Sequence, residues 1–180
     1  IPSSLTEIGK GAFQGCSGLI NITIPGSVTI IGNWTFSDCT SLTSVSIPNG
    51  VTEIGYEAFF CCYSLTNITI PNTVTTIGEY AFECCNSLTS ITIPAGITSI
   101  GRSTFEDCTG LISVTIPDSV TVIGQEAFYR CEKLTSITIP SSVTEIGYEA
   151  FWGCSNLTDI YVNQTESTLL DNADVPDDCW

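Results

Sequence analysis

The feature that most constrains this chain is a repeat of constant length, 23 residues, that runs through nearly all of it. Four residue types keep this step without an insertion or deletion. Proline keeps it at Pro2, Pro25, Pro48, Pro71, Pro94, Pro117 and Pro140, and phenylalanine at Phe13, Phe36, Phe59, Phe82, Phe105, Phe128 and Phe151. Leucine keeps it at Leu19, Leu42, Leu65, Leu88, Leu111, Leu134 and Leu157, and cysteine at Cys16, Cys39, Cys62, Cys85, Cys108, Cys131 and Cys154. Strict self-similarity at such a period is typical of a solenoid, in which each repeat forms one coil stacked on the next.

One unit, residues 134–154, shows what each coil contains. Ile137 and Ile139 are two residues apart, so in a strand both side chains point to one face and the hydroxyl residues beside them point to the other. Pro140 then ends the strand, because proline has no N–H to donate to a ladder. A second short extended segment follows, and the A-F-x-x-C spacing at the end of the unit predicts a short helical or 3₁₀ turn.

No single coil can bury the inward-facing residues of such a unit by itself. Stacking the coils ~4.8 Å apart pairs their strands into a parallel sheet and joins the buried side chains into continuous stripes. The pattern therefore predicts an α/β solenoid, mainly β, with one parallel sheet and short helical or 3₁₀ turns on the opposite side. We expect residues 1–162 to form seven repeats, and residues 163–180, where the pattern lapses, to form a C-terminal cap or tail.

The consensus of the unit, L-x-x-I-x-I-P-x-x-V-T-x-I-G-x-x-A-F-x-x-C, resembles the BspA-type class of leucine-rich repeat over residues 1–162. Thr35 and Thr104 depart from it, because they stand where the pattern has alanine. The resemblance implies a right-handed leucine-rich-repeat superhelix. It also implies a non-enzymatic protein, secreted or attached to the cell surface, that binds host proteins, other cells or matrix components. It names no ligand.

Composition argues against several other classes of function. Nineteen acidic residues against four basic ones give a net charge of −15, which repels phosphate backbones, so nucleic acid is not an expected partner. No apolar stretch reaches the ~20 residues of a spanning helix, so we expect no membrane insertion. Without histidine no Cys–His or Ser–His dyad can form, and no C-x-x-C pair offers a zinc site. We therefore expect no enzymatic activity, no catalytic residue, no bound metal and no cofactor.

The outward row of the predicted sheet is the candidate binding surface for a protein partner on a host or another cell. It consists of short hydroxyl and amide side chains with almost no charge: Asn21, Thr23, Ser44, Ser46, Asn67, Thr69, Ser90, Thr92, Ser113, Thr115, Ser136, Thr138, Asp159 and Tyr161. Two alternatives stay open. The coils could be a structural spacer that displays another domain, since serine and threonine are tolerated on any solvated sheet. A regular lattice of hydroxyl groups could also bind ice, helped by a second unbroken row at Thr6, Thr29, Thr52, Thr75, Thr98, Thr121 and Thr144.

The cysteines divide into two sets. Those in register with the repeat are expected to be buried, reduced thiols, because one inward position of every coil requires a small apolar residue. Their Cβ atoms would lie about 4.8 Å apart, wider than the ~3.8 Å that a disulfide prefers. Cys61 and Cys84 lie outside this register but are 23 residues apart, on the outer side of successive coils. A disulfide between them and a pair of free thiols both remain open, and Cys179 has no evident partner.

Two further features bear on partners. Ile1 corresponds to Ile24 in mid-coil, so we interpret the chain as a piece of a longer protein whose N-terminal end exposes strand edges. A second copy of the chain could bind at that end. Aromatic residues are scattered on the outer side, where they either anchor a partner or pack over neighbouring coils: Trp34, Tyr56, Phe60, Tyr63, Tyr80, Tyr129, Tyr148 and Trp152.

Overall fold

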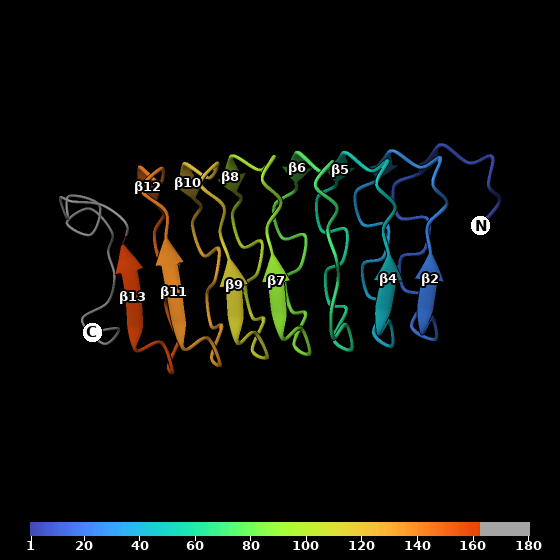
Figure 1. Cartoon of the computed structure of the whole chain (residues 1–180). Helices are drawn as coiled ribbons and strands as arrows, with labels where there is room; N and C mark the ends of the chain where they lie inside the picture. Colours follow the sequence, from blue (N-terminus) through green and yellow to red (C-terminus); the bar gives the residue numbers. More distant parts are fainter. Residues whose placement is uncertain (163–180) are drawn as a thin grey trace.

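The computed structural model describes residues 1–162, so the predicted cap at 163–180 lies outside the described residues. The chain forms a parallel β-solenoid whose coils are stacked from the N-terminal to the C-terminal end (Figure 1). Paired strands are offset by 23 residues, so that Ile31, for example, is the partner of both Ile8 and Ile54. The stacked coils predicted from the period are thus confirmed.

The strands are short and lie on two sides of each coil. The first side, which we call the sheet face, carries β2 (Asn21–Thr23), β4 (Ser44–Ser46), β7 (Ser90–Thr92), β9 (Ser113–Thr115), β11 (Ser136–Ile139) and β13 (Asp159–Val162). The second side, which we call the second ladder, carries β1 (Glu7–Ile8), β3 (Ile30–Ile31), β5 (Glu53–Ile54), β6 (Thr76–Ile77), β8 (Ser99–Ile100), β10 (Val122–Ile123) and β12 (Glu145–Ile146). The short extended segment after each proline therefore pairs with its neighbours as well, and the prediction of a single sheet was incomplete.

The remaining side of each coil, which we call the turn side, holds no helix within residues 1–162, so the predicted helical turns are wrong. Its N–H groups alternate between two kinds of acceptor. The Cys39 N–H donates within its own coil to Phe36 O at 3.1 Å, whereas the Phe36 N–H donates to Ala58 O of the next coil at 2.8 Å. An α-helix is about 10–12 Å across and would hold the coils apart, whereas this path keeps them at the strand spacing of ~4.8 Å.

The turn side reverses direction at two left-handed residues per coil, four positions apart. In the first coil these are Gly11 and Gly15, with φ of 64° and 70°. Later coils mostly use other residues: Trp34, Asp38, Glu57, Cys61, Tyr80, Cys84, Ser103, Asp107, Glu126, Arg130 and Glu149. A left-handed conformation costs an L-residue roughly 1–2 kcal/mol. Hydrogen bonds to the next coil offset that cost, such as the one from Trp34 N–H to Tyr56 O at 2.9 Å.

The phenylalanines form one continuous stack through the solenoid. Neighbouring ring centroids lie 5.3–5.5 Å apart and the ring planes are within 16° of parallel. The rings from Phe36 to Phe128 are fully buried. Burial of each ring contributes ~2 kcal/mol, and each stacked pair adds about 0.5–1.5 kcal/mol. The continuous stripes that the 23-residue period predicts are present.

Candidate binding surface

The structure places all fourteen predicted residues of the sheet face on the surface. In β7, for example, Ser90 and Thr92 are exposed while Ile91 between them is buried in the core. The alternation arises because successive side chains of a strand point to opposite faces. The sheet face is almost neutral, because Asp159 is the single ionisable carboxyl among its fourteen predicted residues.

The sheet face is interrupted near its middle. Residues 67–70 occupy the place of a strand between β4 and β7, but they pair with neither neighbour. Asn67 and Thr69 still point outward, and Ile68 and Ile70 are still buried. The side-chain pattern of a strand therefore persists here without the main-chain ladder. Sequence reasoning missed this interruption, because the segment keeps the same residue types as its neighbours.

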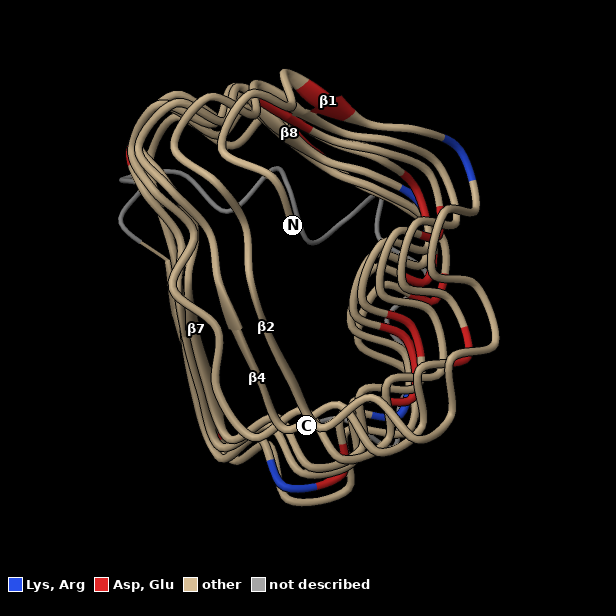
Figure 2. Ribbon diagram, turned by 90° about the vertical axis from the view of Figure 1, so that its right-hand side faces the viewer, with Lys and Arg blue, Asp and Glu red and all other residues tan. Residues whose placement is uncertain are grey.

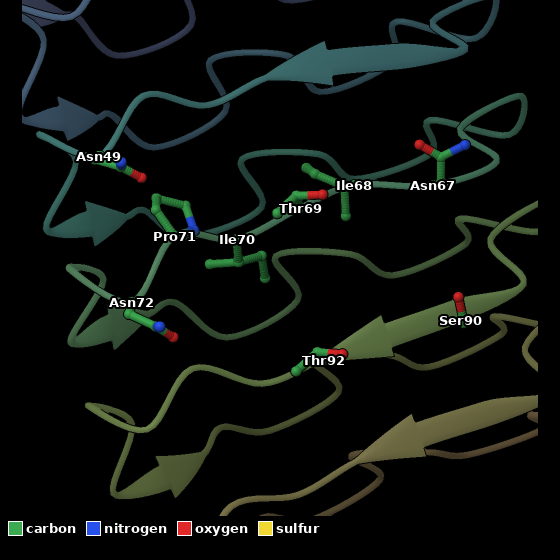
Figure 3. A pocket seen from close by; sticks show the side chains of 9 residues that line it. All are labelled: Asn49, Asn67, Ile68, Thr69, Ile70, Pro71, Asn72, Ser90 and Thr92. Carbon is green, nitrogen blue, oxygen red and sulfur yellow. The ribbon is translucent and has the colours of Figure 1, made fainter.

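An open hollow of about 550 Å³ lies over this interruption. Figure 3 shows Asn67 and Ser90 at one end of it and Asn49 and Asn72 at the other. The remaining lining residues are Ile68, Thr69, Ile70, Pro71 and Thr92. No lining residue is charged, so the hollow offers amide and hydroxyl groups above a small apolar floor. Four of its residues belong to the predicted row, whereas Asn49 and Asn72 were not predicted.

Charge is concentrated on the other sides of the coil. Figure 2 looks along the solenoid and shows most Asp and Glu residues on the side opposite β2, β4 and β7. Part of this charge is paired, as between Arg102 and Glu126 at 3.1 Å and between Arg130 and Asp107 at 3.2 Å. Burial, together with the nearby carboxylate of Glu106, raises the pKa of Glu83 to about 7.

The threonine row proposed as part of an ice-binding lattice uses its hydroxyl donors internally. The hydroxyl groups of Thr52, Thr75, Thr121 and Thr144 each donate to the main-chain carbonyl of the threonine in the preceding coil, at 3.2–3.4 Å. A hydroxyl that donates to the main chain can still accept a hydrogen bond, but it has no second proton to offer. This arrangement stabilises the stack of coils and weighs against a lattice of free donors.

Several outer aromatic residues pack against one another across coils. Trp34 contacts Tyr56 and Tyr56 contacts Tyr80 edge to face, with centroids 5.3 and 5.5 Å apart, and the Lys10 ammonium lies 4.5 Å from the Trp34 ring centroid. Tyr129 and Trp152 form a stacked pair at 4.8 Å. These contacts agree with the packing interpretation.

Other candidate sites are less developed. Within residues 1–162 no group of three or more cysteine and carboxylate side chains is arranged to hold a metal ion. The same residues include no helix with the length and apolar composition needed to cross a bilayer. Near the N-terminal end Ile1 and Ile20 are 45% and 59% exposed. Self-association through this end stays a prediction.

These observations define a class: a helix-free leucine-rich-repeat solenoid with one neutral face. The chain belongs to the BspA type Leucine rich repeat region family, whose sequence model matches residues 1–112 and 75–173 in six copies. A comparison with curated proteins finds no significant match. Repeat solenoids of this kind bury a shared core between neighbouring coils and commonly offer an extended surface for binding.

Solved structures of bacterial proteins share the fold. A leucine rich cell surface protein from Faecalibacterium prausnitzii is 40% identical, with a TM-score of 0.81 over 89% of this chain and 44% of that protein. A Treponema pallidum leucine rich repeat protein, named T. pallidum in its description, is 33% identical, with a TM-score of 0.80 over 86% of this chain and 72% of that protein. A leucine-rich repeat protein from Bacteroides ovatus is 27% identical, with a TM-score of 0.64, over 97% and 57%. The chain thus spans less than half the length of the first relative.

Proposed function

We propose that this chain is a protein-binding module of a bacterial cell-surface protein and that it holds its partner on the sheet face. The observation that carries the proposal is the separation of chemistry around the coil. Charge lies on the turn side and the second ladder, whereas the sheet face is neutral, with a polar hollow near its middle. Membership of the family and the similarity to a bacterial cell surface protein support the location.

The side chains of the sheet face suit the recognition of a neutral, polar protein surface. Serine, threonine and asparagine are short, so they lose little conformational entropy when a partner covers them. Each can both donate and accept hydrogen bonds, which allows a partner of either polarity to be matched. The hollow is within the 300–1,000 Å³ range typical of ligand pockets, and it offers a place for a protruding partner side chain.

The test is a matched pair of double variants. Ser90→Arg with Thr92→Arg places two bulky cations in β7, beside the hollow. Thr76→Arg with Ser99→Arg makes the same change in charge at exposed residues of the second ladder. Binding is measured against a panel of purified extracellular matrix and cell-surface proteins, and Tm is measured for every chain.

The β7 variant is expected to lose at least tenfold in affinity for whichever panel protein the parent binds, with Tm unchanged, because arginine displaces the partner from a desolvated surface. The second-ladder variant should bind like the parent. Equal loss in both variants, or loss in the second-ladder variant alone, would place the binding site elsewhere.

A spacer role is the competing proposal, and the continuous phenylalanine stack favours it. A stack of fully buried rings makes a stiff rod that could hold another domain away from the cell. A spacer predicts that no panel protein binds the parent chain. It also predicts that the β7 variant and the parent are indistinguishable in a cell-adhesion assay with the complete protein.

A further inference from the structure

The cysteines differ in what their sulfur atoms contact. In the register set, from Cys39 to Cys154, each thiol donates to the carbonyl of a phenylalanine in the preceding coil at 3.1–3.3 Å. Cys61 and Cys84 have no carbonyl partner of this kind, and their thiols hydrogen-bond to one another. The Tyr63 hydroxyl also donates to Cys61 Sγ at 3.2 Å. The pair therefore lies together for a reason other than the packing that the register cysteines serve.

The main chain holds the two cysteines side by side. Both have left-handed backbones, with φ of 55° and 59°, and so occupy equivalent positions on successive coils. The Cys61 N–H donates to Glu83 O at 2.9 Å, which keeps the two segments parallel. Chains paired in this way are ~4.8 Å apart, within the 4.4–6.8 Å that disulfides span between Cα atoms. The thiols already contact one another, and closing the bond needs only a small approach of the Cβ atoms.

The coil between these cysteines is weakly bonded on its two other sides. Residues 67–70 pair with neither neighbour, whereas each strand of the sheet face pairs with at least one. On the second ladder β6 pairs with β5 but not with β8, so the ladder stops at this coil. The hollow opens over the same segment. Residues 61–84 thus contain a complete coil that depends mainly on its buried side chains and on the turn side.

We propose that Cys61 and Cys84 form an oxidation site whose disulfide closes this coil into a covalent ring. The oxidant is a small-molecule disulfide. The thiolate of Cys84, which is the more exposed cysteine, attacks the S–S bond of the oxidant and releases one small thiol. The Cys61 thiolate then attacks Cys84 Sγ and displaces the second small thiol. The S–S bond of the oxidant is reduced, and the two cysteine protons end on the two thiols that are released.

The surroundings of the pair control the rate of this exchange. Burial and the neighbouring Cys61 raise the pKa of Cys84 to about 12, and burial also raises the pKa of Cys61. Glu83 and Asp107 add to the rise at Cys84, because they repel a second negative charge. Since the thiolate is the nucleophile, oxidation should be slow at neutral pH and accelerate roughly tenfold per pH unit below that pKa.

The experiment uses the full chain with Cys16→Ser and Cys179→Ser, which removes the exposed Cys16 thiol and the thiol outside the described residues. The chain is incubated with oxidised glutathione at about pH 8.5 to raise the thiolate fraction. We expect a product lighter than the parent by two hydrogen atoms, one cross-linked peptide containing Cys61 and Cys84, and a loss of two alkylatable thiols. Hydrogen–deuterium exchange of residues 67–70 should slow on oxidation and recover after reduction with dithiothreitol.

Cys61→Ser and Cys84→Ser in the same background are the matched controls, and neither should give a cross-link or slower exchange. Because the oxidised and reduced forms of one chain are compared, the result does not depend on how either control folds. A cross-link that includes a register cysteine, or glutathione adducts without a cross-link, would overturn the oxidation site. A correct cross-link that leaves exchange of residues 67–70 unchanged would overturn its role as a ring around the coil. These outcomes are independent of partner binding on the sheet face.

Discussion

The thiol of Cys108 donates a hydrogen bond to the carbonyl oxygen of Phe82, 3.1 Å away in the preceding coil. The same oxygen accepts the N–H of Cys85 at 3.2 Å, so both of its lone pairs are used. The thiol is therefore more than a small apolar filler, because its proton joins two coils at a buried carbonyl. This relationship repeats along the register cysteines and explains why a weakly polar, compact side chain recurs there.

Replacing Cys108 with alanine should lower the free energy of unfolding by about 1–3 kcal/mol, because it removes the hydrogen bond and leaves a small cavity. Urea unfolding monitored by tryptophan fluorescence measures the change. Cys16→Ala is the matched control at the exposed end of the same row, and we expect a change below about 0.5 kcal/mol. Equal effects at both positions would contradict the structural role of the thiol.

Phe82→Ala should destabilise the chain by about 3–5 kcal/mol, because Phe82 is fully buried and stacks on Phe59 and Phe105. Phe13→Ala should cost clearly less, since Phe13 is half-buried and stacks on Phe36 alone among the described rings. Both values follow from chemical denaturation at fixed protein concentration. A larger loss for Phe13 than for Phe82 would show that the ends, not the middle, limit the stability of the solenoid.

Gly78→Ala tests the close approach of neighbouring coils. A Cβ at Gly78 would lie 2.5 Å from Tyr56 N and 2.6 Å from Gly55 C, which are main-chain atoms that cannot turn away. We expect a loss of roughly 1–3 kcal/mol from overpacking, seen as a lower Tm. At Gly26 the same methyl group meets nothing within 4 Å. Gly26→Ala should therefore change stability little, and a comparable loss there would argue against a steric cause.

Glu83 should make stability depend on pH. Burial raises its pKa from an ordinary value of 4.5 to about 7, so the folded chain binds more protons than the unfolded chain in this interval. The free energy of unfolding should then fall as the pH rises from about 4.5 to about 7, by roughly 1–2 kcal/mol after allowance for solvent screening. Glu83→Gln should flatten the curve over that range. A parent and variant with parallel pH profiles would contradict the assignment.

Sequence periodicity was sufficient to predict the stacked coils, because a strict 23-residue step leaves one simple way to bury its apolar residues. It failed on the turn side, where the A-F-x-x-C spacing suits one helical turn and a pair of tight turns equally well. One signal was available: Gly11 and Gly15 occupy both left-handed positions in the first coil. In later coils residues such as Trp34 and Glu57 take these positions and conceal the signal.

The candidate surface was only partly predictable for a different physical reason. Alternation along a strand determines which side chains point outward, so the exposure of Ser90 and Thr92 follows from the pattern. Whether a strand pairs with its neighbours depends on small shifts of the main chain between coils. Residues 67–70 have the same polar and apolar order as β7, and nothing in that order distinguishes the unpaired segment from the paired one.

The constant register between Ile31 and Ile54, and between every other pair of neighbouring coils, has a consequence for inheritance. Any 23-residue stretch between Pro25 and Pro140 could be lost or duplicated, and the two coils brought together would already be complementary. Unequal recombination within the gene would then produce shorter or longer rods that fold without further change. Reach from the cell could evolve in whole coils while the interior stays as it is.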